Sequence, residues 1–268
     1  MPKSSQSAAL AISLNVAGLE AATERSLPVA VNTLARFFAQ HRVAATWGFD
    51  LPGSSPLLTA VQAIQPSQEI AIVARGAWGA ADASRALFDA ELSRRVAAAE
   101  ETGARASTLL VAGGATPAHL DLVEKHGVTA LCRIALNDSH SAIAPASLWR
   151  SGWFAPSAAR AGAAPRSLRW GLWQMPAAID LARLGSWRTR QSILRRAASE
   201  GFAHLCIDMT ALCTGGARAE RQLDAVLTLA AAWQNQGNLR LQGVAETVAQ
   251  LSVSRQGPGA QSILRKAA

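Results

Sequence analysis

Short apolar segments alternate with helix-like segments along most of the chain, and this alternation restricts the possible folds more than any other feature. The pattern predicts strands at residues 8–16, 41–49, 69–74, 107–112, 128–134, 170–176, 202–209 and 239–241. It predicts helices at residues 27–40, 83–102, 117–126, 187–200, 219–236 and 244–251. Strands that alternate with helices form a parallel sheet or barrel with helices around it. The sequence therefore predicts an α/β fold, interrupted by a long irregular connection at 137–169.

The size of the chain suits one such domain. It has 268 residues, of which 50% are hydrophobic, and single α/β barrels often reach this length. We expect one domain at 1–251 and a flexible C-terminal tail at 252–268. The tail holds QSILRKAA (261–268), a near copy of QSILRRAA (191–198). Chance similarity of two Arg/Ala-rich segments and a docking helix for a partner or a second copy both explain this repeat.

Charge and cysteine content narrow the class of protein. The net charge is +8, carried almost entirely by arginine, which favours anionic partners or reflects a coding bias. No Lys/Arg run exceeds two residues, so no nucleic-acid motif is visible. The three cysteines, Cys132, Cys206 and Cys213, form no CxxC pair, which argues against a disulfide framework or a structural zinc site.

The N-terminal segment lacks the pattern of a signal peptide, and no apolar stretch is long enough to predict a transmembrane helix. We therefore expect a cytoplasmic protein with reduced cysteines.

Several segments, in this order, resemble one enzyme family. They are Val43-Ala44-Ala45-Thr46-Trp47, Gln68-Glu69-Ile70-Ala71, the stretch from Leu120 to Val128, Phe202-Ala203-His204-Leu205-Cys206-Ile207 and the closing helix at 223–236. Over residues 8–251 the chain resembles the polysaccharide deacetylase, or NodB-homology, family, and most of all its exopolysaccharide-associated branch. The resemblance implies an irregular (β/α) barrel with its site at the carboxyl ends of the strands.

The resemblance also implies a chemistry that this chain does not carry. Enzymes of the family remove acetyl groups from sugars, with a metal held by one Asp and two His, an Asp base and a late His acid. The position of the base is Asn15, the metal-ligand positions are Val16, Val73 and Ala77, and the late acid falls near Asp208. None of these residue types can do its assigned task at those positions. We therefore expect no metal, no cofactor and no activity by the family mechanism.

Other residues at predicted strand ends remain candidates. His204 and Asp208 have even spacing on one strand, so they share a face and could act in proton transfer, although His204 also matches a framework histidine of the family. Ser13 has no base in a recognisable motif, which leaves a serine hydrolase unsupported. For a surviving ligand cleft we expect contributions from Trp47, Asp50, Trp78, Gly113, Gly114 and Trp173.

The function that the sequence favours is a catalytically inactive deacetylase-like protein that binds a glycan or assists polysaccharide metabolism. Two alternatives of other classes stay open. One is a working hydrolase or deacetylase with an unorthodox site, and the other is a basic scaffold that binds nucleic acid or another polyanion. The tail could dock to a partner in any of them.

Overall fold

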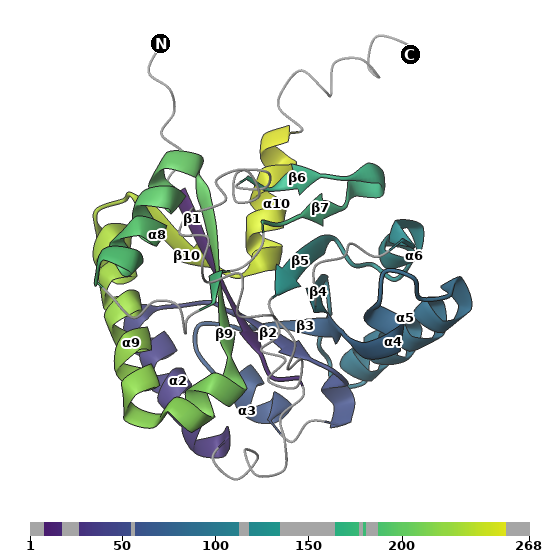
Figure 1. Ribbon diagram of the computed structural model, residues 1–268, viewed down its shortest axis with the longest axis horizontal. Helices are drawn as coiled ribbons and strands as arrows, with labels where there is room; N and C mark the ends of the chain where they lie inside the picture. The colour runs from purple at the N-terminus through teal and green to yellow at the C-terminus, as the bar shows by residue number, and fades with distance from the viewer. Residues whose placement is uncertain are drawn as a thin grey trace, which may run out of the picture.

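One curled, mostly parallel sheet organises the computed structural model, and helices cover its outer side (Figure 1). The structure describes residues 8–17, 27–54, 57–112, 118–134, 164–176, 179–180 and 187–255. The strand order is β6-β7-β5-β4-β3-β2-β1-β9-β8, and β10 pairs with β1. Of these pairings only β6 with β7 is antiparallel. The half-barrel confirms the predicted α/β fold of the (β/α) barrel type.

The strands occupy β1 Ala8–Asn15, β2 Thr46–Phe49, β3 Glu69–Ala74, β4 Thr108–Ala112, β5 Ala130–Ile134, β6 Arg166–Ser167, β7 Trp173–Gln174, β8 Ile179–Asp180, β9 Phe202–Asp208 and β10 Leu239–Gln242. The helices are α2 Leu27–His41, α3 Leu58–Gln62, α4 Gly76–Gly79, α5 Arg85–Glu100, α6 Leu120–Lys125, α8 Trp187–Glu200, α9 Met209–Asn235 and α10 Val244–Arg255, with 3-10 turns η1 Pro52–Ser54 and η3 Arg169–Gly171.

Strand β1 shows how side-chain alternation divides the core into layers. Its even-numbered side chains lie in an outer cluster with residues of α2, α8 and α9, such as Phe38, Ile193 and Leu227. Ala9 and Ala11 lie instead in an inner cluster with residues of β3, β4, β5 and α10. All eight residues of β1 are buried, so the strand reads as one apolar run because helices and barrel interior cover its two faces.

The helices α4, α5 and α6 cover the other half of the sheet. A third cluster joins Trp78 of α4 and Phe88 of α5 to Ile72 of β3 and Leu109 of β4. The rings of Trp78 and Phe88 lie 5.8 Å apart between their centroids. This packing fixes the segment that follows β3, which is the segment where the resemblance expects metal ligands.

Glu69 links the sheet to helix α10 at the amino ends of the strands. Its carboxylate accepts hydrogen bonds from Thr46 Oγ1 of β2 at 2.6 Å, from Thr108 Oγ1 of β4 and from the backbone N–H of Ala245 at 2.9 Å. Thr46 Oγ1 in turn accepts from the N–H of Val244 at 2.9 Å. The network pairs N–H groups in the first turn of α10, where a negative charge is also favoured by the helix dipole.

The sequence predicts most elements to within a few residues. The strand at 69–74 and the helix at 187–200 have the predicted bounds. Residues 41–45 are not part of β2, and α10 continues to Arg255, beyond the predicted end of the domain at 251. Helix α9 begins at Met209 rather than 219, with a break at Gly216, whose φ of 49° and ψ of −144° are not helical. The short helices α3 and α4 were not predicted.

The first copy of the QSILR repeat forms part of α8. Ile193, Leu194 and Ala197 of this copy are buried, which explains its apolar residues as the inner face of a helix. The second copy, at 261–268, lies outside the described residues. Among the described helices, none combines the length and the hydrophobicity needed to cross a bilayer.

We predict that Glu69→Ala lowers the free energy of unfolding by roughly 2–4 kcal/mol, because buried donors on three elements lose their acceptor. Burial raises the pKa of Glu69 above 4.5, against the opposing effect of its hydrogen bonds. The folded state then holds the proton to higher pH than the unfolded chain does. The contribution of this group is therefore full below about pH 4.5 and is lost as the pH rises through the folded pKa.

Denaturant unfolding of wild type, Glu69→Ala and Glu69→Gln across this pH range measures both effects. Glu246→Gln is the matched control, since Glu246 is an exposed carboxylate on the same helix. Equal stability changes for the substitutions at Glu69 and at Glu246 would show that the network does not stabilise the fold.

Candidate functional site

The carboxyl ends of β1 and β9 meet at the expected mouth of the barrel, at the lower edge of Figure 1. Asn15 and Asp208 are partners in the register of these parallel strands, so the structure brings two of the predicted positions together. Each side chain pairs with the backbone that follows it. Asn15 Oδ1 accepts from the N–H of Ala17 at 3.2 Å, and Asp208 Oδ1 accepts from the N–H of Thr210 at 2.9 Å as the N-cap of α9.

The three predicted metal positions do not converge. Val16 lies in the outer cluster, whereas Val73 lies in the inner cluster and is fully buried. Ala77 is exposed on α4. A Cβ on Gly48 would lie 2.8 Å from Val73 Cγ2 and 2.4 Å from Leu110 Cδ1, so side chains fill the interior beside Val73.

Within the described ranges no group of three or more His, Cys, Asp or Glu residues is arranged to hold a metal ion. Apolar side chains occupy the space between Val73 and Gly48. The residues described here therefore do not fit the metal that the resemblance implies.

Ser13 and His204 form a hydrogen-bonded pair inside the barrel. Ser13 Oγ lies 2.9 Å from His204 Nε2, and His204 Nδ1 lies 3.4 Å from the carbonyl oxygen of Pro176. With a proton on Nδ1 donated to that carbonyl, Nε2 accepts the Ser13 hydroxyl proton. Burial lowers the pKa of His204 from 6.5 to about 4, partly offset by the Pro176 carbonyl, so the ring is neutral at pH 7.

Sequence reasoning missed this pair because the two residues are 191 positions apart. Only the pairing of β1 with β9, which places Ala11 beside His204, brings them together. A serine next to a neutral histidine is the beginning of a nucleophile–base arrangement. Ser13 is fully buried and His204 is only 1% exposed, however, so no substrate reaches the hydroxyl group in this structure.

Two of the tryptophans expected in a cleft lie in the core. Trp47 is fully buried in the outer cluster, with its Nε1–H donating to Gln68 Oε1 at 3.1 Å and its ring edge-on to Phe38. Trp173 lies in the inner cluster near the amino end of β5, and its Nε1–H donates to Ser252 Oγ at 3.0 Å. Gly113 and Gly114 lie outside the described residues.

Asp50 and Trp78 line a hollow next to the mouth, which we call the Asp50 hollow. It has a volume of about 500 Å³, and its walls come from the ends of β2 and β3, from α4 and from α5. The lining residues are Asp50, Arg75, Gly76, Ala77, Trp78, Leu87, Glu91, Arg94 and Arg95. Residues 75–78 thus supply one wall of a charged surface hollow, close to Val73 and Ala77, where the resemblance expects metal ligands.

Ion pairs hold the charged groups of the Asp50 hollow in place. The carboxylate of Asp50 lies between Arg75 Nη2 and Arg95 Nη2, each at 3.2 Å. Glu91 pairs with Arg94 at 2.9 Å and also with Arg95. Hydrogen bonds from Arg94 and Arg95 lower the pKa of Glu91, which therefore stays ionised. The guanidinium carbon of Arg95 lies 4.4 Å from the ring centroid of Trp78, a cation–π contact.

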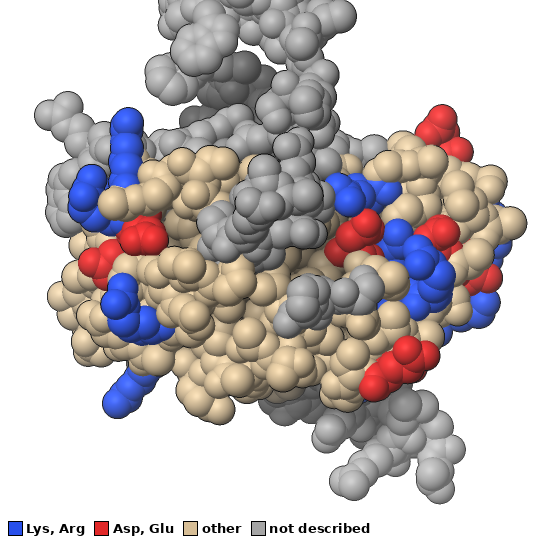
Figure 2. All heavy atoms as spheres, turned by 90° about the horizontal axis from the view of Figure 1, so that it is seen from below, with Lys and Arg blue, Asp and Glu red and all other residues tan. Residues whose placement is uncertain are grey.

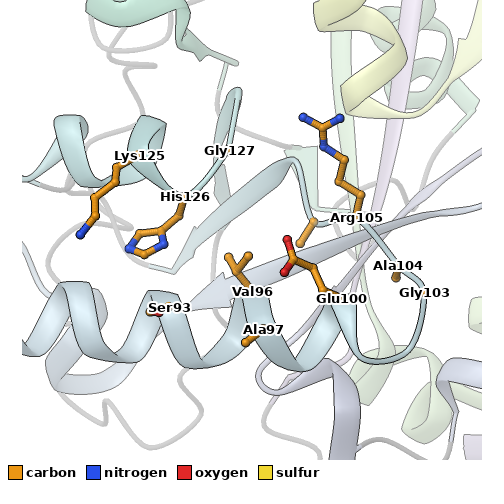
Figure 3. Close-up of a pocket in the computed structure, with 11 residues that line it drawn as sticks. Ser93, Val96, Ala97, Glu100, Gly103, Ala104, Arg105, Lys125, His126 and Gly127 are labelled. Carbon is orange, nitrogen blue, oxygen red and sulfur yellow. The ribbon is translucent and has the colours of Figure 1, made fainter.

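A second hollow lies at the opposite end of the strands (Figure 3). It has a volume of about 670 Å³ and is formed by α5, by residues 103–106 before β4 and by residues 125–127 before β5. Its basic groups at one end, Lys125 and His126, both pair with Asp89. Because active sites of (β/α) barrels form at the carboxyl ends of strands, the Asp50 hollow is the better candidate site although it is smaller.

The charged side chains form no extended basic patch on the face shown in Figure 2. Lys and Arg lie next to Asp and Glu there, over much of the charged area. Such intermixing fits the ion pairs around Asp50 and Glu91. It gives no support on that face to a surface built for a long polyanion.

Comparison with solved structures identifies the fold. A protein of Pseudomonas aeruginosa PAO1, classed provisionally as a polysaccharide deacetylase, matches with a TM-score of 0.60 and 13% identity over 90% of this chain and 89% of that one. A CE4 family pseudoenzyme from Bacillus anthracis matches with a TM-score of 0.52 and 11% identity over 91% of this chain and 66% of its own length. A mutant of that pseudoenzyme has restored enzymatic activity.

The Puue allantoinase also matches, with a TM-score of 0.57 and 12% identity over 90% of this chain and 89% of that chain. Comparison with protein-family models and with curated protein sequences finds no match. This chain therefore has the fold of the polysaccharide deacetylases, as its sequence predicts, and the likeness shows the fold alone. The same fold supports different reactions, so the residues at the site must carry the functional argument.

We predict that His204 makes the stability of the protein fall as the pH falls from about 6.5 to about 4. The unfolded chain takes up a proton in this interval and the buried ring does not. At the acid end of this interval the free energy of unfolding is lower by roughly 3 kcal/mol, which follows from the difference between the unfolded and the folded pKa of His204. Denaturant unfolding at several pH values should show a shallower acid slope for His204→Gln than for wild type. His119→Gln serves as the control, and equal slopes in all three proteins would contradict the prediction.

Proposed function

We propose that this protein has lost the deacetylase reaction of its fold and acts by binding a glycan, as an accessory of polysaccharide metabolism. One observation carries the proposal. At the positions where the sequence resemblance expects a base and three metal ligands, the chain has Asn15 bonded to the backbone of Ala17, Val16 and Val73 in two separate apolar clusters, and Ala77 on a surface helix.

Without the metal ligands and the general base, deacetylation by the family mechanism would lose most of its rate enhancement. Coordination to a metal lowers the pKa of water by several units, to about 7, and each unit is worth about 1.4 kcal/mol. A positioned general base contributes a further factor of about 10²–10⁴. Asn15 cannot take up a proton at neutral pH, and the side chains of valine and alanine bind no metal. Hydrolysis of an acetyl group by the family mechanism should therefore be undetectable.

The remaining candidates for catalysis have other partners. His204 is buried and bonded to Ser13 and Pro176, while Asp208 caps α9. In a working enzyme that uses His204 and Asp208, the imidazole ring of His204 would have to become accessible from the mouth of the barrel. A protein that binds its ligand in a surface hollow needs no such change. The buried thiols of Cys132 and Cys206 fit a protein that works in a reducing compartment such as the cytoplasm.

The first test is the metal content of the purified full chain together with a calorimetric zinc titration. We expect well below one equivalent of transition metal and no saturable heat. Incubation with acetylated chito-oligosaccharides and with acetylated xylan should release no acetate above a buffer blank, while an active deacetylase run in parallel does. One equivalent of tightly bound zinc, or acetate release that disappears in His204→Gln, would overturn the proposal.

A further inference from the structure

We propose that the Asp50 hollow binds the carboxylate of an acidic sugar, such as a uronic acid unit. The preference for a carboxylate rests on the hollow itself, and the sugar rests on the proposed function above. The inference goes beyond that function because it assigns the site, the charge of the ligand and the residues that contact it.

The hollow holds more donors than its own acceptors use. Three guanidinium groups, from Arg75, Arg94 and Arg95, face two carboxylates, Asp50 and Glu91. Each guanidinium carries five N–H donors in a planar fork. The Arg75 side chain is 37% exposed and makes a 3.2 Å contact to Asp50 through Nη2, and the Arg94 side chain is 53% exposed. Both can therefore offer N–H groups to a ligand without leaving their present positions.

The balance of charge favours a carboxylate over a phosphate monoester. Three positive and two negative side chains leave one positive charge in the hollow. One carboxylate neutralises this charge. A phosphate monoester, with close to two negative charges at neutral pH, would leave an excess of negative charge beside Asp50 and Glu91. A carboxylate also matches the fork of a guanidinium in a bidentate pair.

Two buried donors in the lining have no partner among the described residues. They are the Nε–H of Arg95, whose side chain is 6% exposed, and the Nε1–H of Trp78. Unpaired buried N–H groups are rare in folded proteins, and those that occur call for an explanation such as a missing water or ligand. Both N–H groups belong to residues that line the Asp50 hollow.

The size and place of the hollow suit a small polar ligand. Its volume of about 500 Å³ falls within the usual range for ligand clefts. It opens beside the carboxyl ends of β2 and β3, next to the mouth where this fold carries out chemistry. Rigid elements hold it, because Arg95 is fixed by Trp78, Glu91 and Asp50 at once. A ligand would therefore contact the fixed guanidinium group of Arg95 together with the exposed guanidinium groups of Arg75 and Arg94.

The test uses oligogalacturonate and its methyl ester, two probes of the same sugar that differ in the carboxylate charge. Calorimetry with the full chain at low salt should show saturable binding of the acid and at least tenfold weaker binding of the ester, because charge-assisted hydrogen bonds are lost. Arg75→Gln should weaken binding of the acid about tenfold. Arg105→Gln is the matched control, since it removes the same charge from the other hollow.

A second variant should strengthen binding. Asp50→Asn removes the carboxylate that competes for Arg75 and raises the local charge, so oligogalacturonate should bind several-fold more tightly. Loss of fold alone cannot produce this gain, and unfolding midpoints of every variant accompany the titrations. Equal binding of acid and ester, equal effects of Arg75→Gln and Arg105→Gln, or tighter binding of a sugar phosphate would each overturn the inference.

The outcomes also separate this inference from the proposed function. Saturable binding of neutral oligosaccharides with no preference for the acid leaves the proposed function standing and contradicts the carboxylate site. Turnover of an acetylated substrate, with binding of oligogalacturonate still dependent on Arg75, contradicts the proposed function and supports the site.

Discussion

The carboxylate of Glu69 joins the sheet to helix α10, and much of the barrel depends on it. It accepts from Thr46 on one neighbouring strand, from Thr108 on the other and from the first turn of α10. Burying a carboxylate is unfavourable, and burial accordingly raises the pKa of Glu69. Several donors must converge on it to offset that cost. The convergence fixes three strands and one helix relative to one another, which closes the amino end of the barrel.

This network also explains the polar residues at the start of β3. Gln68-Glu69-Ile70-Ala71 is the start that resembles the deacetylase family, and both polar residues in it have structural tasks. Gln68 Oε1 accepts from the N–H of Ala45 at 3.0 Å and from Trp47 Nε1–H. Glu69 holds α10. The strand start that carries the resemblance is therefore explained by its hydrogen bonds within the fold.

The sequence predicts the sheet well because burial on both faces imposes an apolar pattern along each strand. Strand β3 has the predicted bounds for this reason, whereas helix α8 has them because its buried residues recur at helical spacing. The short helix α4 was missed, because four residues give no helical period. The Ser13–His204 pair was missed because it depends on a contact between distant strands. Trp47 was expected in a cleft, since a strand position alone does not say which face of the sheet a side chain joins.

The Asp50 hollow could be predicted from the sequence only in part. Asp50 and Trp78 follow successive parallel strands, so their nearness to one edge of the sheet can be read from the sequence. The arginines that give the hollow its charge come from one turn of α5 and from the residue after β3. Helix α5 has the length and composition of an ordinary surface helix. Only its packing through Phe88 and Trp78 shows that Arg95 faces inward.

The polar residues left at the mouth need no catalytic explanation. A turn that leaves a buried strand exposes backbone N–H groups, and these require acceptors. Asn15 supplies one for Ala17, and Asp208 supplies one for Thr210 at the start of α9. Asparagine and aspartate are the residues best suited to both tasks. Local hydrogen bonding alone is enough to explain an oxygen atom at each of these two positions. On the proposal made above, a ligand binds beside the barrel instead, in the Asp50 hollow, where three arginines face two carboxylates.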